Sequence, residues 1–394
     1  MQKTRWLLNG IVMICFMDLF VQLPVMGPFA QSLGAGSFQI GLAVGLYSLT
    51  NMLGNMIAGI WIDRFGGKPI LLTGLLLTAS IILLYPLVQQ PTHLLMVRVL
   101  HGLSGGLLVP SAFTLVSRYA SGRGQGRSMA LSGAAVGVAA IVGPASAGIL
   151  KASVGLDRLF MSLSGLLVMG AILVWVGAPK STKGKEEEAG SIRVRESRSA
   201  FLAAIRQKSV IQSYFGAFSL MFAMGALTFS LPLKVDALGF PVQTAGMMLS
   251  VFGVVAICMF LLPTNRMFDQ GSPLKLSLAG GLLVIISLFA LSLMQHRIAM
   301  FGVMAVYGLG FALLFPSLNA LLVKHIASEH KGKAFGLFYA FFSLGVVAGS
   351  SGVGAFTENY DTALRIAAIF LLLSCGLLIV WQFVRSGRRI IAKS

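Results

Sequence analysis

Asp18 is the residue of this chain whose type and position best suit reversible proton binding. It lies near the middle of an apolar run, in Cys15-Phe-Met-Asp18-Leu-Phe-Val-Gln22, whereas the other eleven acidic residues fall in polar gaps or at the ends of apolar runs. A low-dielectric surrounding disfavours the ionised carboxylate, so a change of conformation would change its affinity for a proton. Gln22, one helical turn further along, extends the same polar stripe. Asp18 is therefore the expected proton carrier.

Arg98 is the expected charge partner of Asp18. It occurs in the run Arg98-Val-Leu-His101-Gly102-Leu-Ser-Gly105-Gly106, roughly 7–8 Å inside the outer end of its segment at about 1.5 Å per residue. A guanidinium beside a carboxylate favours the ionised form, which opposes the effect of burial. Two plainer interpretations stay open. Arg98 snorkels to the outer interface, or Asp18 makes a structural ion pair or hydrogen bond between helices.

The elements that must position these two residues are membrane-spanning helices. Of the 394 residues, 56% are hydrophobic and 11% are charged, against about a quarter charged in an ordinary soluble protein. A span needs about 20 apolar residues, and the runs of such residues predict twelve spans, at 7–31, 38–61, 69–89, 93–118, 127–150, 157–178, 210–234, 241–264, 273–294, 297–325, 332–356 and 361–385. The predicted fold class is an all-α polytopic membrane protein with two pseudo-symmetric six-helix bundles.

One long polar stretch divides the chain. Residues 179–209 predict a cytoplasmic connector between a first bundle over 1–178 and a second bundle over 210–394. Of the 30 lysines and arginines, 24 lie on the same side as this connector and both termini. Positively charged residues favour the cytoplasmic side of a membrane. We therefore expect a multi-pass protein of the cell membrane with both termini in the cytoplasm.

The two halves of the chain resemble each other at a constant offset of 206 residues. The run from Gly102 to Ser111 recurs from Gly308 to Ser317, and the same offset pairs Asp63 with Asp269 and further basic residues and glycines in the loops and helices. A repeat that holds its register through both loops and helices indicates duplication. Two parallel six-helix repeats are an architecture of secondary transporters, whose binding sites lie near the midplane.

The loop between the second and third spans carries a motif. Its sequence is Gly59-Ile-Trp-Ile-Asp63-Arg64-Phe-Gly66-Gly-Lys68, which resembles the signature of the major facilitator superfamily at this loop. The resemblance covers all twelve spans. It implies transport by alternating access, in which the two halves rock about a shared site.

The same resemblance implies a cytoplasmic gate formed by Gly59, Asp63, Arg64, Gly66 and Lys68, with the eleventh span as its partner. A carboxylate such as Asp63 is favoured near the N-terminus of a helix. A solvated turn with ordinary cytoplasmic charges is the plainer interpretation. The second half keeps its acidic residue at Asp269 but loses much of the pattern, which indicates a weaker second gate.

Small residues at particular positions also resemble motifs of this superfamily. We expect Gly102 in the fourth span, and Gly143, Pro144 and Gly148 in the fifth, to permit close helix packing and bending. The run in the fifth span resembles a motif associated with exporters that exchange substrate for protons. It departs from that motif at two positions, where alanine stands in place of glycine: Ala139 and Ala147. Small-residue packing common to any membrane bundle is the alternative.

Aromatic and other large side chains predict a surface for the cargo. They recur at helical spacing on the seventh and tenth spans, and such a stripe faces either a cavity or lipid. In proteins of the resembled family these two helices line the cavity, which implies a lipophilic or aromatic substrate. The candidate cavity residues are Gln22, Met26, Phe218, Phe222, Tyr307, Phe311, Phe315 and Asn319. For Asn319 we expect either a hydrogen bond to a neighbouring helix or a substrate contact.

The resulting hypothesis is a secondary active transporter that exports small lipophilic or cationic compounds in exchange for protons. No metal-ligand spacing and no phosphate-binding loop are found, so we expect no enzyme activity, no cofactor and no metal. The basic residues sit in gaps between spans, which argues against nucleic-acid binding. A monomer is expected. An uptake symporter for a metabolite, a lipid flippase and a non-transporting receptor or scaffold are the alternatives.

Overall fold

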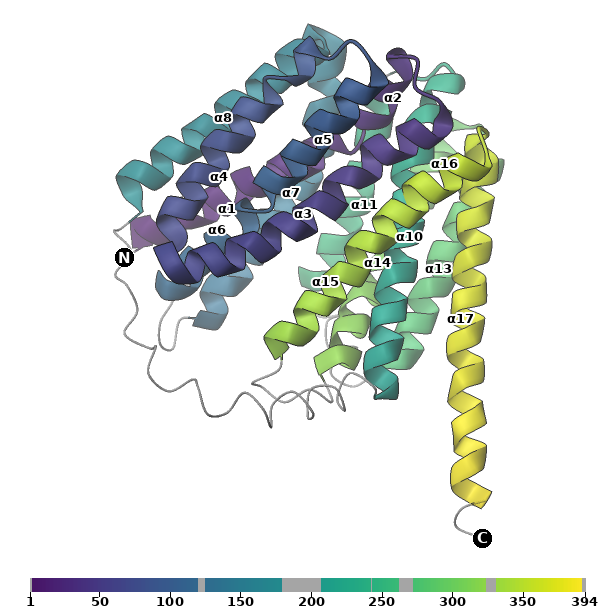
Figure 1. Cartoon of the computed structure of the whole chain (residues 1–394). Coiled ribbons are helices and arrows are strands. Elements are labelled where there is room, and N and C mark those ends of the chain that lie inside the picture. Colours follow the sequence, from purple (N-terminus) through teal and green to yellow (C-terminus); the bar gives the residue numbers. More distant parts are fainter. Residues whose placement is uncertain are drawn as a thin grey trace.

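A computed structural model of the chain describes residues 2–119, 125–178, 207–241, 243–261, 272–323 and 331–391. The described part is helical and contains no strand. The helices run roughly alongside one another in a bundle (Figure 1). The predicted connector at 179–209 falls outside the described residues except for its last three.

Helices of the first half correspond to the first six predicted spans. In chain order they are α1 (Gln2–Gln22), α2 (Met26–Ser32), α3 (Ser37–Phe65), α4 (Gly67–Ile82), the short 3-10 helix η1 (Tyr85–Leu87), α5 (Pro91–Gly105), α6 (Leu108–Tyr119), α7 (Gln125–Val154) and α8 (Leu156–Gly177). Long apolar helices form here because every backbone polar group must be satisfied within the segment when no water is present.

Helices of the second half correspond to the last six predicted spans. They are α10 (Lys208–Ala237), α11 (Gln243–Leu261), α13 (Pro273–Leu293), α14 (Arg297–Val323), α15 (Lys331–Val347), the π-helical turn η4 (Ala348–Gly352), α16 (Val353–Phe356) and α17 (Tyr360–Ile391). The predicted fold class is confirmed: the chain is an all-helical polytopic membrane protein with twelve spans in two six-helix halves.

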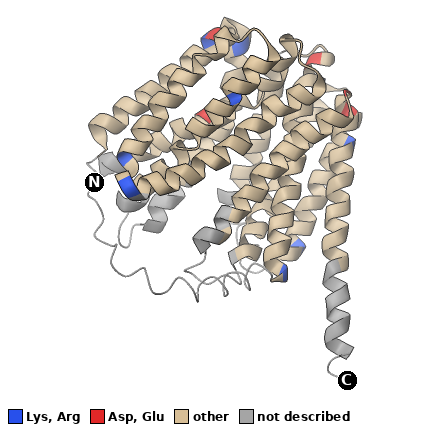
Figure 2. Cartoon of the chain, viewed as in Figure 1, with Lys and Arg blue, Asp and Glu red and all other residues tan. Residues whose placement is uncertain are grey.

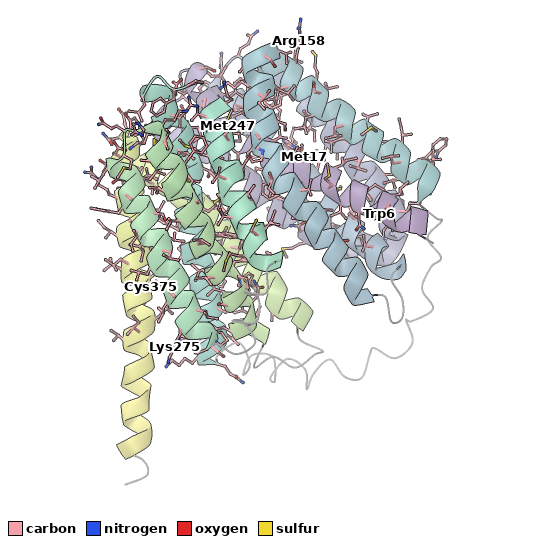
Figure 3. The ribbon with its side chains drawn as sticks, turned by 180° about the vertical axis from the view of Figure 1, so that it is seen from behind. Trp6, Met17, Arg158, Met247, Lys275 and Cys375 are labelled. Carbon is pink, nitrogen blue, oxygen red and sulfur yellow. The ribbon has the colours of Figure 1, made fainter. Side chains whose placement is uncertain are left out.

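Ten segments of the described chain are long and apolar enough to span a membrane on their own. A bent pair, Trp6–Gln22 with Met26–Ser32, forms one further span with an angle of 44° between its parts, and the remaining span is the shorter apolar helix Gln243–Met259. Large apolar side chains such as Trp6 project from the flanks of the bundle (Figure 3). The charged residues gather mainly at the two ends of the helices (Figure 2).

Four of the predicted spans are interrupted rather than continuous, including the third, in which residues 83–84 separate α4 from η1. The first is broken at 23–25, where Pro24 disfavours helical geometry in the residue before it. The fourth is broken between Gly105 and Leu108, and the eleventh contains the π turn of η4. Interruptions of this kind inside membrane helices are tolerated where they are buried in protein, and π turns are frequent at functional sites.

The two halves approach each other closely at one end of the bundle. We name this the closed end; it carries the turns at 33–36, 155, 238–241 and 357–359. A Cβ added to Gly41 of α3 would lie 2.2 Å from the Ser350 carbonyl oxygen, and one added to Gly354 would lie 2.4 Å from that of Ser37. From this end, α3 and α15 diverge toward the opposite end, where α8 ends and α10 begins, which we name the connector end (Figure 1).

A buried ion pair ties helices of the second half together at the closed end. Lys234 of α10 is 1% exposed, and its Nζ donates to Oδ1 of Asp361 (2.5 Å) and to the carbonyl oxygen of Leu291 (2.7 Å). Removing one partner of such a pair leaves the other charge without compensation. The pair therefore holds α10 against α13 and α17.

Replacing Asp361 with asparagine is expected to lower the stability of the protein. Because Asp361 is 28% exposed and Lys234 keeps its bond to Leu291, we expect a loss of about 1–3 kcal/mol. Thermal unfolding in detergent measures this. The double variant Lys234→Met/Asp361→Asn should recover most of the loss because no buried ammonium remains. A single variant as stable as the wild type would contradict this role of the pair.

Candidate proton-binding site

Asp18 lies in the last turns of α1 and is completely enclosed by protein. Its Oδ1 accepts a hydrogen bond from Nε2 of Gln22 (3.1 Å) and lies 3.0 Å from Nε2 of His101. Its Oδ2 accepts a hydrogen bond from the hydroxyl of Tyr47 (3.1 Å). Side chains from α1, α3 and α5 thus surround one carboxyl group. Among residues whose side chains are described, Asp18 is the one acidic residue that is buried.

Glycines of α5 bring α3 close enough to form this site. A Cβ added to Gly102 would lie 1.9 Å from Oγ1 of Thr50, and one added to Gly105 would lie 2.7 Å from the hydroxyl of Tyr47. At Gly102 the backbone oxygen of Tyr47 would also lie 2.6 Å away, so no side chain fits there without moving α3. At Gly105 a side chain would displace the Tyr47 hydroxyl. Small residues in membrane helices permit this close approach of backbones. The run of glycines in α5 therefore places the Tyr47 hydroxyl against Asp18.

Arg98 points into the protein rather than toward the membrane surface. It is 3% exposed, and its guanidinium donates to the carbonyl oxygens of Ala43 (2.6 Å) and Val44 (3.3 Å) in α3. It also donates to Oε1 of Gln22 and lies over the ring of Tyr47, 4.8 Å from the ring centre. The snorkelling interpretation is therefore wrong.

The expected pairing of Arg98 with Asp18 is indirect in the structure. Within the described part of the chain, no ion pair joins the two side chains, and Gln22 stands between them. The amide of Gln22 accepts from the guanidinium and donates to the carboxylate. The physical reason is that the carbonyls of α3 take up two of the guanidinium donors and hold Arg98 to one side.

His101 is a member of the site that the sequence analysis missed. Its imidazole is completely buried, with Nε2 at Asp18 and Nδ1 2.8 Å from the hydroxyl of Tyr85. The signal in the sequence was its place one helical turn after Arg98. A lone histidine has no metal-ligand spacing, so the spacing of residues alone gave His101 no role.

Aromatic rings cover the site on the side of the closed end. Tyr85 follows α4, is completely buried, and stacks on Phe160 of α8 with ring centres 4.5 Å apart. Phe29 of α2 packs against both rings, at 6.4 Å from Tyr85 and 5.8 Å from Phe160. On the opposite side, Asn51 follows Tyr47 by one turn of α3 and is only partly buried. Asn51 thus lies one turn nearer the connector end than Tyr47.

The second half has neither a carboxyl nor an imidazole at the positions that correspond to Asp18 and His101. At the offset of 206 residues, Asp18 corresponds to Met224 and His101 to Tyr307. The contact itself is kept, since the hydroxyl of Tyr307 lies 3.8 Å from Sδ of Met224. A thioether is a weak acceptor that does not bind a proton in water. The proton chemistry of the duplicated position is therefore confined to the first half.

The aromatic residues predicted to contact cargo form two separate groups. Tyr307, Phe311 and Phe315 of α14 lie in one ladder, in which Phe252 of α11 packs edge-on against Tyr307 and Phe311 with ring centres 5.5 and 5.2 Å apart. Phe311 and Phe315 stack at 5.7 Å. The helical spacing predicted that these three side chains share a face, and they do.

Phe218 and Phe222 of α10 belong to the other group. Both rings pack on Phe370 of α17, with ring centres 6.1 and 4.2 Å from it. No described ring contact joins them to the α14 ladder. The spacing along a helix identifies a face, but not the neighbour that this face meets.

Met26 and Asn319 occupy different surroundings from those expected of cavity residues. Met26 begins α2 and is 2% exposed, within the apolar core. The side-chain amide of Asn319 donates to the carbonyl oxygen of Phe315 in its own helix (2.8 Å). The second N–H and the oxygen of this amide are not used in that bond, so a substrate contact of Asn319 stays a prediction.

The predicted gate residues are spread over one end of the first half. Gly66 has φ +87° and joins α3 to α4, and a Cβ added to Gly59 would meet nothing within 4 Å. Lys68 donates to the backbone carbonyls of Trp175 (3.0 Å) and Ala178 at the end of α8, where a cation is favoured. Arg64 is exposed, the side chain of Asp63 is outside the described part, and so is the whole of Asp269.

The small residues predicted for packing lie at helix contacts. A Cβ on Gly143 would lie 2.7 Å from Cβ of Phe20 in α1. One on Gly148 would lie 2.7 Å from Cα of Gln243 in α11, across the boundary between the halves. The carbonyl oxygen of Pro144 would lie 2.1 Å from a Cβ placed on Gly246 of α11. Two of these contacts join the halves, and Gly143 joins α7 to the helix that carries Asp18.

Comparison with known proteins gives one consistent family. The profile described as Major Facilitator Superfamily matches residues 8–350 and, in an overlapping second match, 263–391. Multidrug resistance protein 2 of Bacillus subtilis strain 168 is 24% identical over 97% of this chain and 96% of its own length. Quinolone resistance protein NorA of Staphylococcus aureus strain Mu50 is 22% identical over 92% of both chains.

Solved structures share the fold at low sequence identity. The crystal structure of a bacterial homolog of the human lysosomal transporter Spinster, in an inward-facing and unoccupied conformation, has a TM-score of 0.81 and 14% identity. The match covers 96% of each chain. This likeness extends through both six-helix halves.

Proposed function

The chain belongs to the major facilitator superfamily, and from that premise we propose that this membrane transporter exports small lipophilic or cationic compounds in exchange for protons. It is a multi-pass membrane protein and not an enzyme. The observation that carries the proposal is Asp18, the one buried acidic side chain among those that the structure describes, which is contacted by polar side chains of three helices of the first half. Relatives named as multidrug and quinolone resistance proteins support the cargo class.

The proton would be exchanged at Asp18, with Arg98 acting on it through Gln22. Donors from Gln22 and Tyr47, together with the contact to His101, favour the ionised carboxylate. In this conformation the site would therefore have released its proton, and the protein would be able to take up cargo. Opening of the closed end would separate the halves and change the surroundings of α1, which alters the affinity of the site for a proton.

The two halves, 1–178 and 210–394, would rock about their contact as rigid bodies joined by the connector 179–209. We place the connector end and both termini in the cytoplasm because 24 of the 30 basic residues lie on that side. The closed end then faces outward. In the opposite state, Asp63, Arg64 and Lys68 would meet α15, with a weaker counterpart at Asp269. We expect a monomer to suffice, since each chain holds the complete proton site.

The cargo would lie against the α14 ladder formed by Tyr307, Phe311 and Phe315. Aromatic faces attract organic cations by about 0.5–2 kcal/mol per contact, and they accept lipophilic molecules of varied shape. The soft pair Met224 and Tyr307 occupies the position that the proton site has in the other half. The first half would then bind the proton, and the second half would bind the cargo.

Uptake of a metabolite together with protons is the second candidate. Ala139 and Ala147, which replace glycine in the exporter-like run of α7, are the observation that favours it. Both are completely buried in the apolar core. A symporter would use the same proton site but move cargo in the same direction as the proton.

Transport of ethidium, a planar aromatic cation, into proteoliposomes tests the proposal. With an acidic lumen, antiport predicts accumulation of the dye inside by protein oriented with its connector end outward, and a reversed gradient predicts its extrusion. Liposomes without protein supply the control for passive leak. Dye movement in the same direction as the proton would favour the symporter, and flux indifferent to the gradient would contradict proton coupling.

A further inference from the structure

We propose that the proton of this site is held by the imidazole of His101, with Asp18 as the carboxylate that orients and stabilises it. The inference deepens the proposed function and rests on it for its physiological meaning. It follows from the contacts on both ring nitrogens of His101, which no motif of the sequence indicated. The ligand of the site is the proton itself.

The two ring nitrogens of His101 face groups of different chemistry. Nε2 lies 3.0 Å from Oδ1 of Asp18, and Nδ1 lies 2.8 Å from the hydroxyl of Tyr85. A neutral imidazole that donates from Nε2 to the carboxylate must accept at Nδ1, and the hydroxyl of Tyr85 can donate there. In the empty state the Nδ1 lone pair is therefore the next position to take a proton.

Protonation at Nδ1 can be accommodated without moving a heavy atom. The incoming proton binds the Nδ1 lone pair, the imidazolium then donates from Nε2 to Asp18 and from Nδ1 to the oxygen of Tyr85, and the hydroxyl hydrogen of Tyr85 rotates away. Release reverses these steps. The tyrosine hydroxyl acts as donor in one state and as acceptor in the other, which a hydroxyl allows.

The environment of Asp18 decides which partner carries the extra proton. Protonating the imidazole or protonating the carboxyl gives the same net charge for the pair, so neighbouring hydrogen bonds settle the choice. Gln22 and Tyr47 both donate to the carboxylate oxygens. Those bonds are lost or weakened when the carboxyl is neutral. The arrangement of an ionised carboxylate that orients an imidazole also occurs in serine hydrolases.

The described titratable and charged groups near His101 lie on α1, α3 and α5 and just before α5. On α1 these are Asp18 and, one turn before it, Cys15; on α3 it is Tyr47; before α5 it is Tyr85. Arg98 on α5 itself is the fixed positive charge among the described neighbours of His101. Asp18 favours the imidazolium and Arg98 opposes it, and Asp18 is the nearer of the two because it contacts the ring.

Nitrogen-15 NMR of histidine-labelled protein in detergent, between pH 5 and 8, tests this assignment. The signal of His101 is identified as the one lost in His101→Gln. We expect it to show two protonated ring nitrogens at low pH and one at high pH, and saturating ethidium should convert the first form to the second. In Asp18→Asn the pH midpoint should fall by at least one pH unit, which is a tenfold loss of proton affinity.

His101→Gln itself supplies a second readout. Ethidium affinity of the wild type should rise with pH across this range, while His101→Gln should bind ethidium with an affinity that is nearly independent of pH. His93→Gln is the matched control, because His93 lies on the same helix and is exposed. It should retain the wild-type pH dependence.

Two results would overturn the proposal: a His101 ring that stays neutral throughout the range, or an unchanged pH dependence of ethidium affinity in His101→Gln. Either would return the proton to the carboxyl of Asp18 and leave proton-coupled export intact. Failure of the proposed function looks different, since wild-type proteoliposomes would then show no gradient-driven flux whatever the NMR reports.

Discussion

Asp18→Asn is expected to abolish ethidium transport driven by a pH gradient, down to the level of liposomes without protein. The amide cannot bind a proton or stabilise an imidazolium on His101, yet it keeps the shape of the side chain and can accept from Tyr47. Binding of ethidium without a gradient should persist because the α14 ladder is untouched. Fluorescence of the dye in proteoliposomes, with and without the gradient, measures both effects.

A control for Asp18→Asn is available at the surface of the same half. Asp157 lies exposed in the first turn of α8, so Asp157→Asn removes the same charge where no coupling is expected. It should transport like the wild type. Full gradient-driven flux in Asp18→Asn, with insertion and folding unchanged, would remove Asp18 from the mechanism.

Gly41→Val is expected to hold the protein with its closed end open and so to prevent the transport cycle. A Cβ at Gly41 would lie 2.2 Å from the carbonyl oxygen of Ser350, and a backbone atom cannot move aside as a side chain does. Overpacking costs about 1–3 kcal/mol, and this penalty applies only in the closed state, in which α3 and η4 are in contact. The closed state should therefore lose population by roughly five- to 150-fold.

The distance between spin labels across the closed end measures this shift. Phe38 and Glu358 are both exposed, come from different halves and line the cavity of about 410 Å³ at that end, so labels there report its opening once the three native cysteines are replaced. We expect longer distances and a loss of gradient-driven flux in Gly41→Val. Gly165→Val in α8 is the control, because a Cβ there meets nothing within 4 Å. Wild-type distances in Gly41→Val would contradict the account of closure.

The hydropathy of the chain predicted most of the fold because a membrane imposes a single length on every span. It did not predict where the spans are interrupted. The break between Gly105 and Leu108 depends on α3 packing against the glycines of α5, and that contact joins segments far apart in the chain. Periodicity within one helix contains no such information.

The candidate site could be predicted in part for the same reason. Asp18 was identifiable because no other acid falls near the middle of a span, and Arg98 because of its motif. The direct partner of Asp18 is nevertheless His101, with Arg98 held off by the carbonyls of α3. Arg98 and His101 lie one helical turn apart on the same face of α5. Which of these two turns lies level with Asp18 is a tertiary property.

Proton release on binding of cargo tests the central claim most directly. Ethidium is added to purified protein in weakly buffered detergent near pH 6.5, and a pH indicator counts the protons set free. We predict one proton for each ethidium bound to a protonated wild-type site, and almost none for Asp18→Asn at equal dye binding. Equal proton release from the two proteins, or ethidium binding by the wild type with no release, would contradict it.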